Sequence, residues 1–101
     1  MKRARIEIPE ERLAEFCRIH RIQKLSLFGS VLREDFGPDS DVDVLVEFKP
    51  GTRIGLIRLG RLEYELSGIF GRKVDLNTPG FISKYFRPEI MAEREVQYAE
   101  A

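Results

Sequence analysis

The chain has 101 residues, of which 17 are basic and 17 acidic, so its formal net charge is zero. This length predicts one domain, residues 1–101, with a real core but no room for a second domain. The balanced charge argues against a generic nucleic-acid-binding protein, which would carry a basic excess. No apolar run approaches the roughly 20 residues that span a bilayer, so no membrane association is expected.

The single cysteine, Cys17, excludes an internal disulfide. No signal-peptide pattern opens the chain, and together these features predict a cytoplasmic protein. We expect Cys17 itself to be a small buried hydrophobic residue.

The first half of the chain alternates between helical and strand patterns. Pro9 and the apolar residues that follow it at helical spacing predict an amphipathic helix over residues 9–20. A strand is expected over residues 22–28, a short helix over 30–34, and the longest strand over 41–48.

In the second half, leucines at three- and four-residue spacing predict a helix over residues 54–69, with Gly71 as its C-terminal cap. A strand over 73–76, a short helical piece over 81–86 and a last helix over 88–98 follow. This order predicts an α/β fold with a small mixed sheet and helices packed mainly on one face.

The most informative motif is Gly29-Ser30, followed after ten residues by Asp41-Val42-Asp43. Alternate residues of a strand point to the same face, so Asp41 and Asp43 project together. Aspartate is depleted in strands, and two adjacent carboxylates repel unless a cation lies between them. Mg²⁺ prefers such oxygen ligands together with substrate phosphates. Asp75 would complete a cluster of three carboxylates that could hold two ions.

Three residues before the aspartates have both a structural and a functional interpretation. Gly29 could be a simple turn glycine and Ser30 a helix N-cap. Alternatively, the pair could let a phosphate approach the backbone at a helix start. Arg33 could be a solvated arginine, a partner of Asp35, or a ligand of phosphate oxygens, which a guanidinium suits.

Four other polar residues are expected to have structural roles. Arg72 and Lys73 are expected as strand-edge charges, Ser40 as a residue that orients the loop before Asp41, and His20 as a packed imidazole on the inner face of the first helix.

From Leu25 to Tyr98 these motifs resemble the DNA polymerase beta nucleotidyltransferase superfamily. They are most similar to its minimal members, the MntA-type antitoxins found beside HEPN-domain toxins. The resemblance implies the catalytic core fold of that superfamily and Mg²⁺-dependent transfer of AMP from ATP. It implies that Asp41, Asp43 and Asp75 are catalytic metal ligands, and that the nucleotide-binding residues are Gly29, Ser30 and Arg33.

The small size of the chain leaves no domain to enclose an acceptor. The resemblance therefore implies that the acceptor lies in a partner, as a tyrosine hydroxyl of a HEPN toxin that modification silences. Two alternatives stay open: a non-catalytic module that neutralises a HEPN partner by contact alone, and a small-molecule nucleotidyltransferase of the aminoglycoside-modifying type. In the second alternative, a homo-oligomer could supply the missing wall of the acceptor site.

Overall fold

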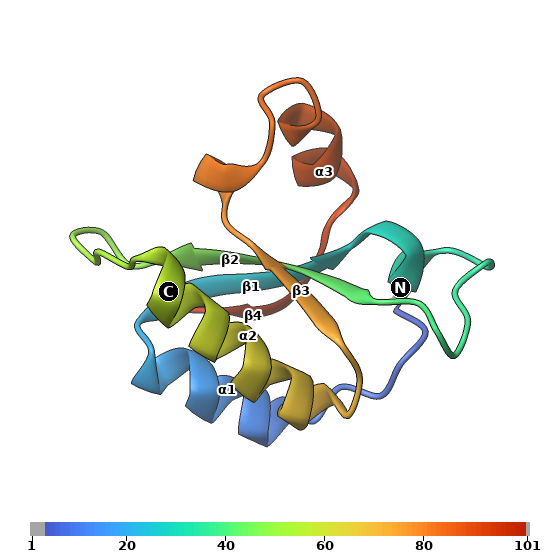
Figure 1. The fold of residues 1–101 in the computed structure, drawn as a ribbon, viewed down its shortest axis with the longest axis horizontal. Coiled ribbons are helices and arrows are strands. Elements are labelled where there is room, and N and C mark those ends of the chain that lie inside the picture. Colours follow the sequence, from blue (N-terminus) through green and yellow to red (C-terminus); the bar gives the residue numbers. More distant parts are fainter. Residues whose placement is uncertain (1–3, 101) are drawn as a thin grey trace.

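The computed structural model describes residues 4–100, which form one four-stranded sheet with helices on both faces (Figure 1). The elements in chain order are α1 (Glu10–Ile19), β1 (Ile22–Phe28), the 3-10 helix η1 (Gly29–Leu32), β2 (Val42–Phe48), α2 (Leu56–Phe70), β3 (Val74–Asn77), the 3-10 helix η2 (Pro79–Phe81), α3 (Arg87–Glu93) and β4 (Glu95–Ala99).

The strand order is β3-β2-β1-β4. The central strand β1 is antiparallel to both β2 and β4, whereas β2 and β3 are parallel. A parallel pair needs a crossover connection, which α2 supplies. The predicted small mixed sheet is confirmed.

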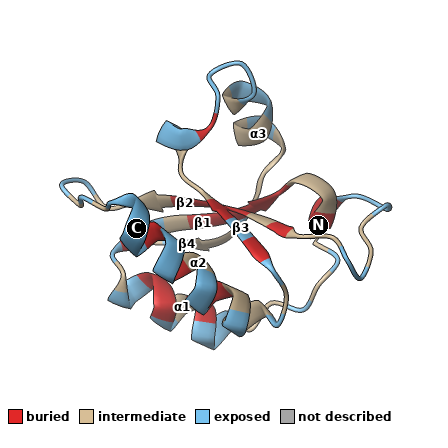
Figure 2. Ribbon diagram, viewed as in Figure 1, coloured by how far each residue is buried: buried red, intermediate tan, exposed pale blue. Residues whose placement is uncertain are grey.

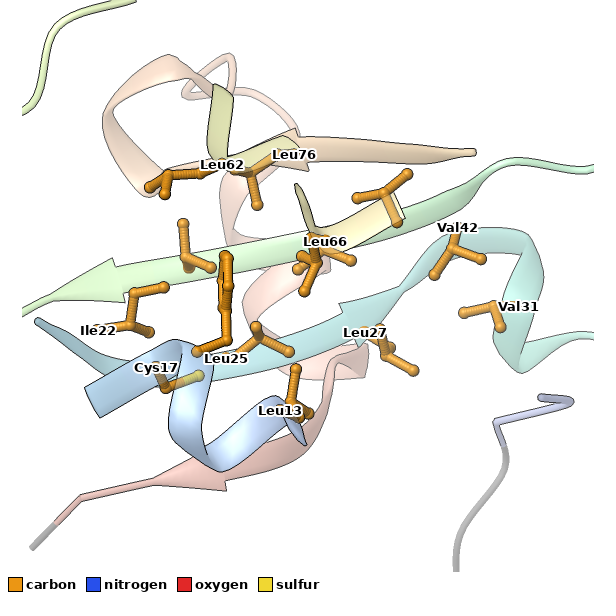
Figure 3. Packing of buried hydrophobic residues seen from close by; sticks show 14 of the residues in the cluster. Leu13, Cys17, Ile22, Leu25, Leu27, Val31, Val42, Leu62, Leu66 and Leu76 are labelled. Carbon is orange, nitrogen blue, oxygen red and sulfur yellow. The ribbon is translucent and has the colours of Figure 1, made fainter. Parts of the chain in front are cut away.

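Helices α1 and α2 cover one face of the sheet, and α3 lies over the other (Figure 1). The main core lies under α1 and α2, where strand residues of alternate positions meet leucines of the helices (Figure 3). Val42, Val44 and Val46 of β2 are fully buried there. Burying each such side chain contributes about 1.5–3 kcal/mol, so this face fixes the register of β2.

The opposite face has a smaller apolar cluster. Phe28, Leu45 and Ile82 are buried in it, and Ile90 and Met91 of α3 pack against them. None of the residues of α3 is buried, which Figure 2 shows as a helix without red segments. Because the second cluster covers only part of this face, polar side chains occupy the rest of it.

The last part of the chain differs from the prediction. A helix over 88–98 is wrong: α3 ends at Glu93, and Arg94 leaves the helical region with φ −54° and ψ 146°. The β-forming residues Val96 and Tyr98 then belong to β4, which pairs with β1 and satisfies the backbone hydrogen-bonding groups along its open edge. The helical piece over 81–86 is also wrong, since η2 ends at Phe81 and a turn precedes α3.

The other predicted helices and strands are confirmed to within two residues. Gly71 caps α2 in the left-handed region, with φ 67°. Cys17 is completely buried, as expected. His20 follows α1 as its C-cap instead of lying inside the helix, and its Nε2 is 3.1 Å from Oε2 of Glu65. In residues 4–100, no helix is long and apolar enough to cross a membrane.

Candidate active site

Two carboxylates lie side by side on the face of the sheet that carries α3. Asp43 of β2 and Asp75 of β3 are register partners across the parallel strand pair. Their neighbours Val42 and Val74 are buried in the main core, so both aspartates point to the opposite face. Asp41 immediately precedes β2, and its side chain is 44% exposed. Asp43 and Asp75 therefore share one face of the sheet, whereas Asp41, the predicted same-face partner of Asp43, lies just before the strand.

The three carboxylates repel one another. Burial raises the pKa of Asp43 to about 6, and the charges of Asp75 and Asp41 add to this effect. The guanidinium of Arg33 acts in the opposite direction. A carboxylate held near two others at this cost has a charge that a cation would stabilise.

Hard oxygen donors of this kind fit Mg²⁺. In residues 4–100, however, no three His, Cys, Asp or Glu side chains are close enough to form a ready-made metal site. Mg²⁺ is usually bound through one or two carboxylates, with water and substrate phosphates as the remaining ligands. The donor set thus suits an ion that arrives with a phosphate-bearing substrate.

Gly29 forms the wall next to Asp43. Its φ is +74°, and a Cβ atom built at this position would lie 2.3 Å from Oδ2 of Asp43. Only glycine combines this conformation with so close an approach. The structure therefore explains glycine at this position by the turn and by the approach of Asp43, and the approach of a phosphate to its backbone stays a prediction.

The start of η1 differs in detail from the sequence-based expectation. Phe28 is the residue that precedes η1, so Ser30 lies inside the 3-10 helix and is not its N-cap. Arg33 lies within the short helix predicted over 30–34, but in the structure it follows η1 in an extended conformation. Its side chain instead turns toward Glu93, with Nη2 3.5 Å from Oε1. The backbone N–H of Gly29 donates to the same Oε1 atom, at 3.3 Å.

The loop before Asp41 is held by Arg72. Its Nη2 donates to the carbonyl oxygens of Gly37 and Ser40, and its guanidinium lies 4.3 Å from the ring centroid of Phe36. The hydroxyl of Ser40 accepts a hydrogen bond from the Gly37 N–H at 3.1 Å, which confirms its orienting role. Lys73 remains exposed at the strand edge, with Nζ 3.9 Å from Oδ2 of Asp41.

Side chains of α2 hold β3 beside β2. Ser67 Oγ accepts from the Val74 N–H at 3.0 Å, and Glu63 Oε2 accepts from the Leu76 N–H at 2.8 Å. These two bonds bracket Asp75 and fix the strand that presents it. Nothing in the local sequence marks Glu63, Ser67, Arg72 or Glu93 for these roles, because each acts on a residue distant in sequence.

Comparisons with known proteins agree with this geometry. The family model of the nucleotidyltransferase domain matches residues 10–97. A Methanocaldococcus jannaschii protein named as a putative protein adenylyltransferase is 38% identical over 74 residues, which are 73% of this chain and 77% of the relative.

Solved structures have the same fold. One is described as a putative minimal nucleotidyltransferase, with a TM-score of 0.70 and 30% identity over 85% of this chain and 86% of that one. A toxin–antitoxin structure with AMP-PNP has a TM-score of 0.75 and 19% identity, over 92% and 75% of the two chains. A tri-AMPylated Shewanella oneidensis HEPN toxin in complex with an MNT antitoxin gives a TM-score of 0.67 and 19% identity, over 90% and 70%.

The family model covers most of the chain, and the M. jannaschii relative aligns with the chain over more than two thirds of both sequences. The carboxylates of β2 and β3 and the glycine of η1 lie together on one face of the sheet that these proteins share. The chain therefore belongs to the nucleotidyltransferase family, has the fold of its minimal members, and is a nucleotidyltransferase.

Proposed function

We propose that this chain transfers AMP from ATP to a tyrosine hydroxyl of a HEPN-domain partner, in a Mg²⁺-dependent reaction, and so acts as an antitoxin. The single observation that carries the proposal is the register pairing of Asp43 with Asp75, next to the close approach of Gly29 to Asp43. The M. jannaschii relative named as a protein adenylyltransferase and the AMPylated HEPN toxin in one similar complex support the choice of reaction and partner.

In this proposal, Asp41, Asp43 and Asp75 hold Mg²⁺. The bound ions would neutralise phosphate charge and polarise the reacting oxygens. The Gly29 N–H, the Ser30 hydroxyl and the Arg33 guanidinium position the β and γ phosphates. Such a reaction depends mainly on positioning and charge neutralisation, which these side chains supply without covalent chemistry of their own.

The reaction balances as a single displacement. The acceptor oxygen forms a bond to the α-phosphorus of ATP, and the bond from that phosphorus to the bridging oxygen breaks. Pyrophosphate leaves with the electron pair, and Asp75 helps to remove the hydroxyl proton. Asp75 suits this role because it is exposed at the edge strand β3, where an acceptor from another molecule can reach it.

The proposal is tested by incubating the chain with Mg·ATP and its cognate HEPN protein and measuring the intact mass of the partner. Mass should appear on the partner in steps of one AMP, on tyrosine, and should be lost with EDTA. An unmodified partner that is still inhibited would indicate neutralisation by contact alone. Efficient modification of an aminoglycoside without a partner would indicate the small-molecule reaction.

A variant separates the roles of the carboxylates. Asp75→Asn should still bind Mg·ATP, because Asp41 and Asp43 remain, but should lose single-turnover transfer by a factor of about 100 or more. Calorimetric titration and single-turnover rates measure the two effects. Equal losses of affinity and rate would contradict this division of roles.

A further inference from the structure

The site described above already contains an anion. The carboxylate of Glu93, the last residue of α3, accepts the Gly29 N–H at 3.3 Å and lies 3.5 Å from the Arg33 guanidinium. Both contacts are made by the same oxygen atom, Oε1. A single oxygen held by a backbone amide and a guanidinium is the arrangement that a phosphate oxygen would adopt with these two groups.

We propose that Glu93 is an autoinhibitory residue, whose carboxylate holds the phosphate-binding groups of η1 until the triphosphate of the nucleotide displaces it. The inference rests on the proposed function insofar as it takes Gly29 and Arg33 as phosphate ligands. Beyond that function, the inference assigns Glu93 as a group of the same chain that competes with the triphosphate for Gly29 and Arg33 and so lowers the affinity for nucleotide.

The contact can open at small cost. Glu93 and Arg33 are partly solvated, with side chains 28% and 55% exposed, and exposed ion pairs are weak. No residue of α3 is buried, so the helix that carries Glu93 has few buried contacts to lose. A ligand with several negative charges can therefore displace the contact.

The surroundings of Glu93 fit such a displacement. A pocket of about 330 Å³ lies between η1 and α3, and Gly29, Arg33, Phe86, Glu89 and Glu93 are among its lining residues. The residue after Glu93 is fixed, because Arg94 pairs with Glu47 of β2. The backbone at the end of α3 can therefore stay in place while the Glu93 side chain rotates into the pocket or to solvent.

Two variants of Glu93 test the inference, with a matched control. Glu93→Ala removes both contacts, and Glu93→Gln keeps the shape but removes the charge. Glu89→Gln makes the same charge change in the same pocket, whereas the bonds to Gly29 and Arg33 come from Glu93. Titration calorimetry with inorganic tripolyphosphate and with AMP-PNP, both with Mg²⁺, gives the affinities, and circular dichroism checks that each variant is folded.

Glu93→Ala should bind tripolyphosphate about three- to tenfold more tightly than the unchanged chain, Glu93→Gln should gain a smaller factor, and Glu89→Gln should change affinity less than twofold. Unchanged or weaker binding by both Glu93 variants would overturn the inference, because it would make Glu93 neutral or a positioning group. An equal gain in Glu89→Gln would also overturn it, since the effect would then be one of general charge.

The outcome is distinguishable from a failure of the proposed function. Tighter binding by Glu93→Ala without any AMP transfer would support the autoinhibitory contact and refute the transfer reaction. AMP transfer with no change of affinity in the Glu93 variants would support the transfer reaction and refute the autoinhibitory contact. No binding of tripolyphosphate by any of these proteins would overturn the autoinhibitory contact, whereas the transfer reaction is judged by AMP transfer alone.

Discussion

The ionised side chain of Asp43 in the candidate site lowers the stability of the fold. Its pKa is raised from 3.8 to about 6, first by burial and then by the charges of Asp75 and Asp41. Between these pH values the folded chain binds a proton that the unfolded chain has lost, so the free energy of unfolding falls as the pH rises. Above pH 6 the ionised carboxylate lowers the stability of the fold, and this is the state that would bind the proposed metal ion.

Asp43→Asn should therefore stabilise the chain in the absence of metal. We expect the free energy of unfolding to rise by about 1–2 kcal/mol at pH 7.5, less than the full shift implies because the group is partly solvated, and to be unchanged at pH 4. Urea unfolding in EDTA at both pH values measures this. Asp39→Asn, at an exposed position, is the control. Lower stability of the Asn variant at pH 7.5 would show that Asp43 has a stabilising partner when ionised.

Gly29→Ala tests the close approach on the other side of Asp43. The added Cβ would lie 2.3 Å from Oδ2 of Asp43, and φ +74° strains any residue with a side chain. We expect a loss of about 1–2 kcal/mol in the free energy of unfolding and a loss of transfer of tenfold or more, because the Asp43 carboxylate must turn away. Urea unfolding and initial transfer rates measure both effects.

Gly60→Ala is the matched control for this glycine. Its Cβ would meet nothing within 4 Å, and it lies inside α2, where alanine favours the helix. It should leave transfer unchanged and slightly stabilise the chain. Equal behaviour of the two alanine variants would contradict a special role for Gly29.

At the scale of single residues, sequence reasoning predicted the carboxylates of the candidate site but not the residues that position them. The period-two alternation of buried valines places Asp43 and Asp75 each on the face of its strand that points away from the core, and the pairing of β2 with β3 brings the two together. Arg72 and Glu93 act instead through contacts that span 35 and 64 residues of sequence. Those contacts exist only once the strands are ordered, so no local pattern predicts them.

At the scale of elements, the loop 37–40 and the strand β3 are the parts that bring Asp41 and Asp75 to the site. The loop depends on the two hydrogen bonds that Nη2 of Arg72 donates and on the packing of its guanidinium over the ring of Phe36. Lysine lacks the flat guanidinium that packs on this ring. The position of the loop before Asp41 should therefore be sensitive to replacement of Arg72 by lysine, although the charge is kept.

Arg72→Lys should loosen the loop before Asp41 while leaving the core intact. We expect the Mg²⁺ concentration for half-maximal transfer to rise by about three- to tenfold, with a loss of about 1 kcal/mol in the free energy of unfolding. Metal titration of the transfer rate is the measurement, and Arg58→Lys on the exposed surface of α2 is the control. An unchanged Mg²⁺ dependence would separate Arg72 from the position of Asp41.

The wrong prediction of a helix over residues 88–98 has a physical cause. Residues 95–99 contain β-forming and helix-forming side chains, so the sequence alone predicts that the helix continues through them. The open edge of β1 decides the outcome, because β4 pairs with residues 24–27 of β1 and satisfies their backbone groups. Pairing between the first and last strands of the chain is a long-range event, and periodicity within one segment cannot report it.

At the scale of the whole molecule, the apolar side chains of α2 divide between core and surface. Leu59, Leu62 and Leu66 of α2 are buried. Exposed aromatic residues occur instead on the segment between β3 and α3. This segment lies on the α3 side of the sheet (Figures 1 and 2), the face to which Asp43 and Asp75 point. We define this aromatic patch as Phe81, Tyr85 and Phe86, which are 58%, 80% and 61% exposed.

We expect the aromatic patch to contact the partner that presents the acceptor hydroxyl. Large exposed aromatics near a catalytic site are typical anchors of an interface. The double variant Phe81→Ser, Tyr85→Ser should lower the rate of partner modification at limiting partner concentration by about tenfold. Its affinity for Mg·ATP should stay unchanged, because Phe86 and not these two residues lines the pocket beside Gly29 and Arg33.

The matched control lies on the other face of the sheet. Ile57 and Tyr64 of α2 are 80% and 84% exposed, so Ile57→Ser, Tyr64→Ser removes a similar apolar surface far from the carboxylates. Partner modification and complex formation, measured by intact mass and by calorimetry, should be unaffected in this control. A loss in the α2 variant with none in the patch variant would place the partner on the α1 and α2 face. Its acceptor would then have to reach around the edge strand β3, where Asp75 is exposed.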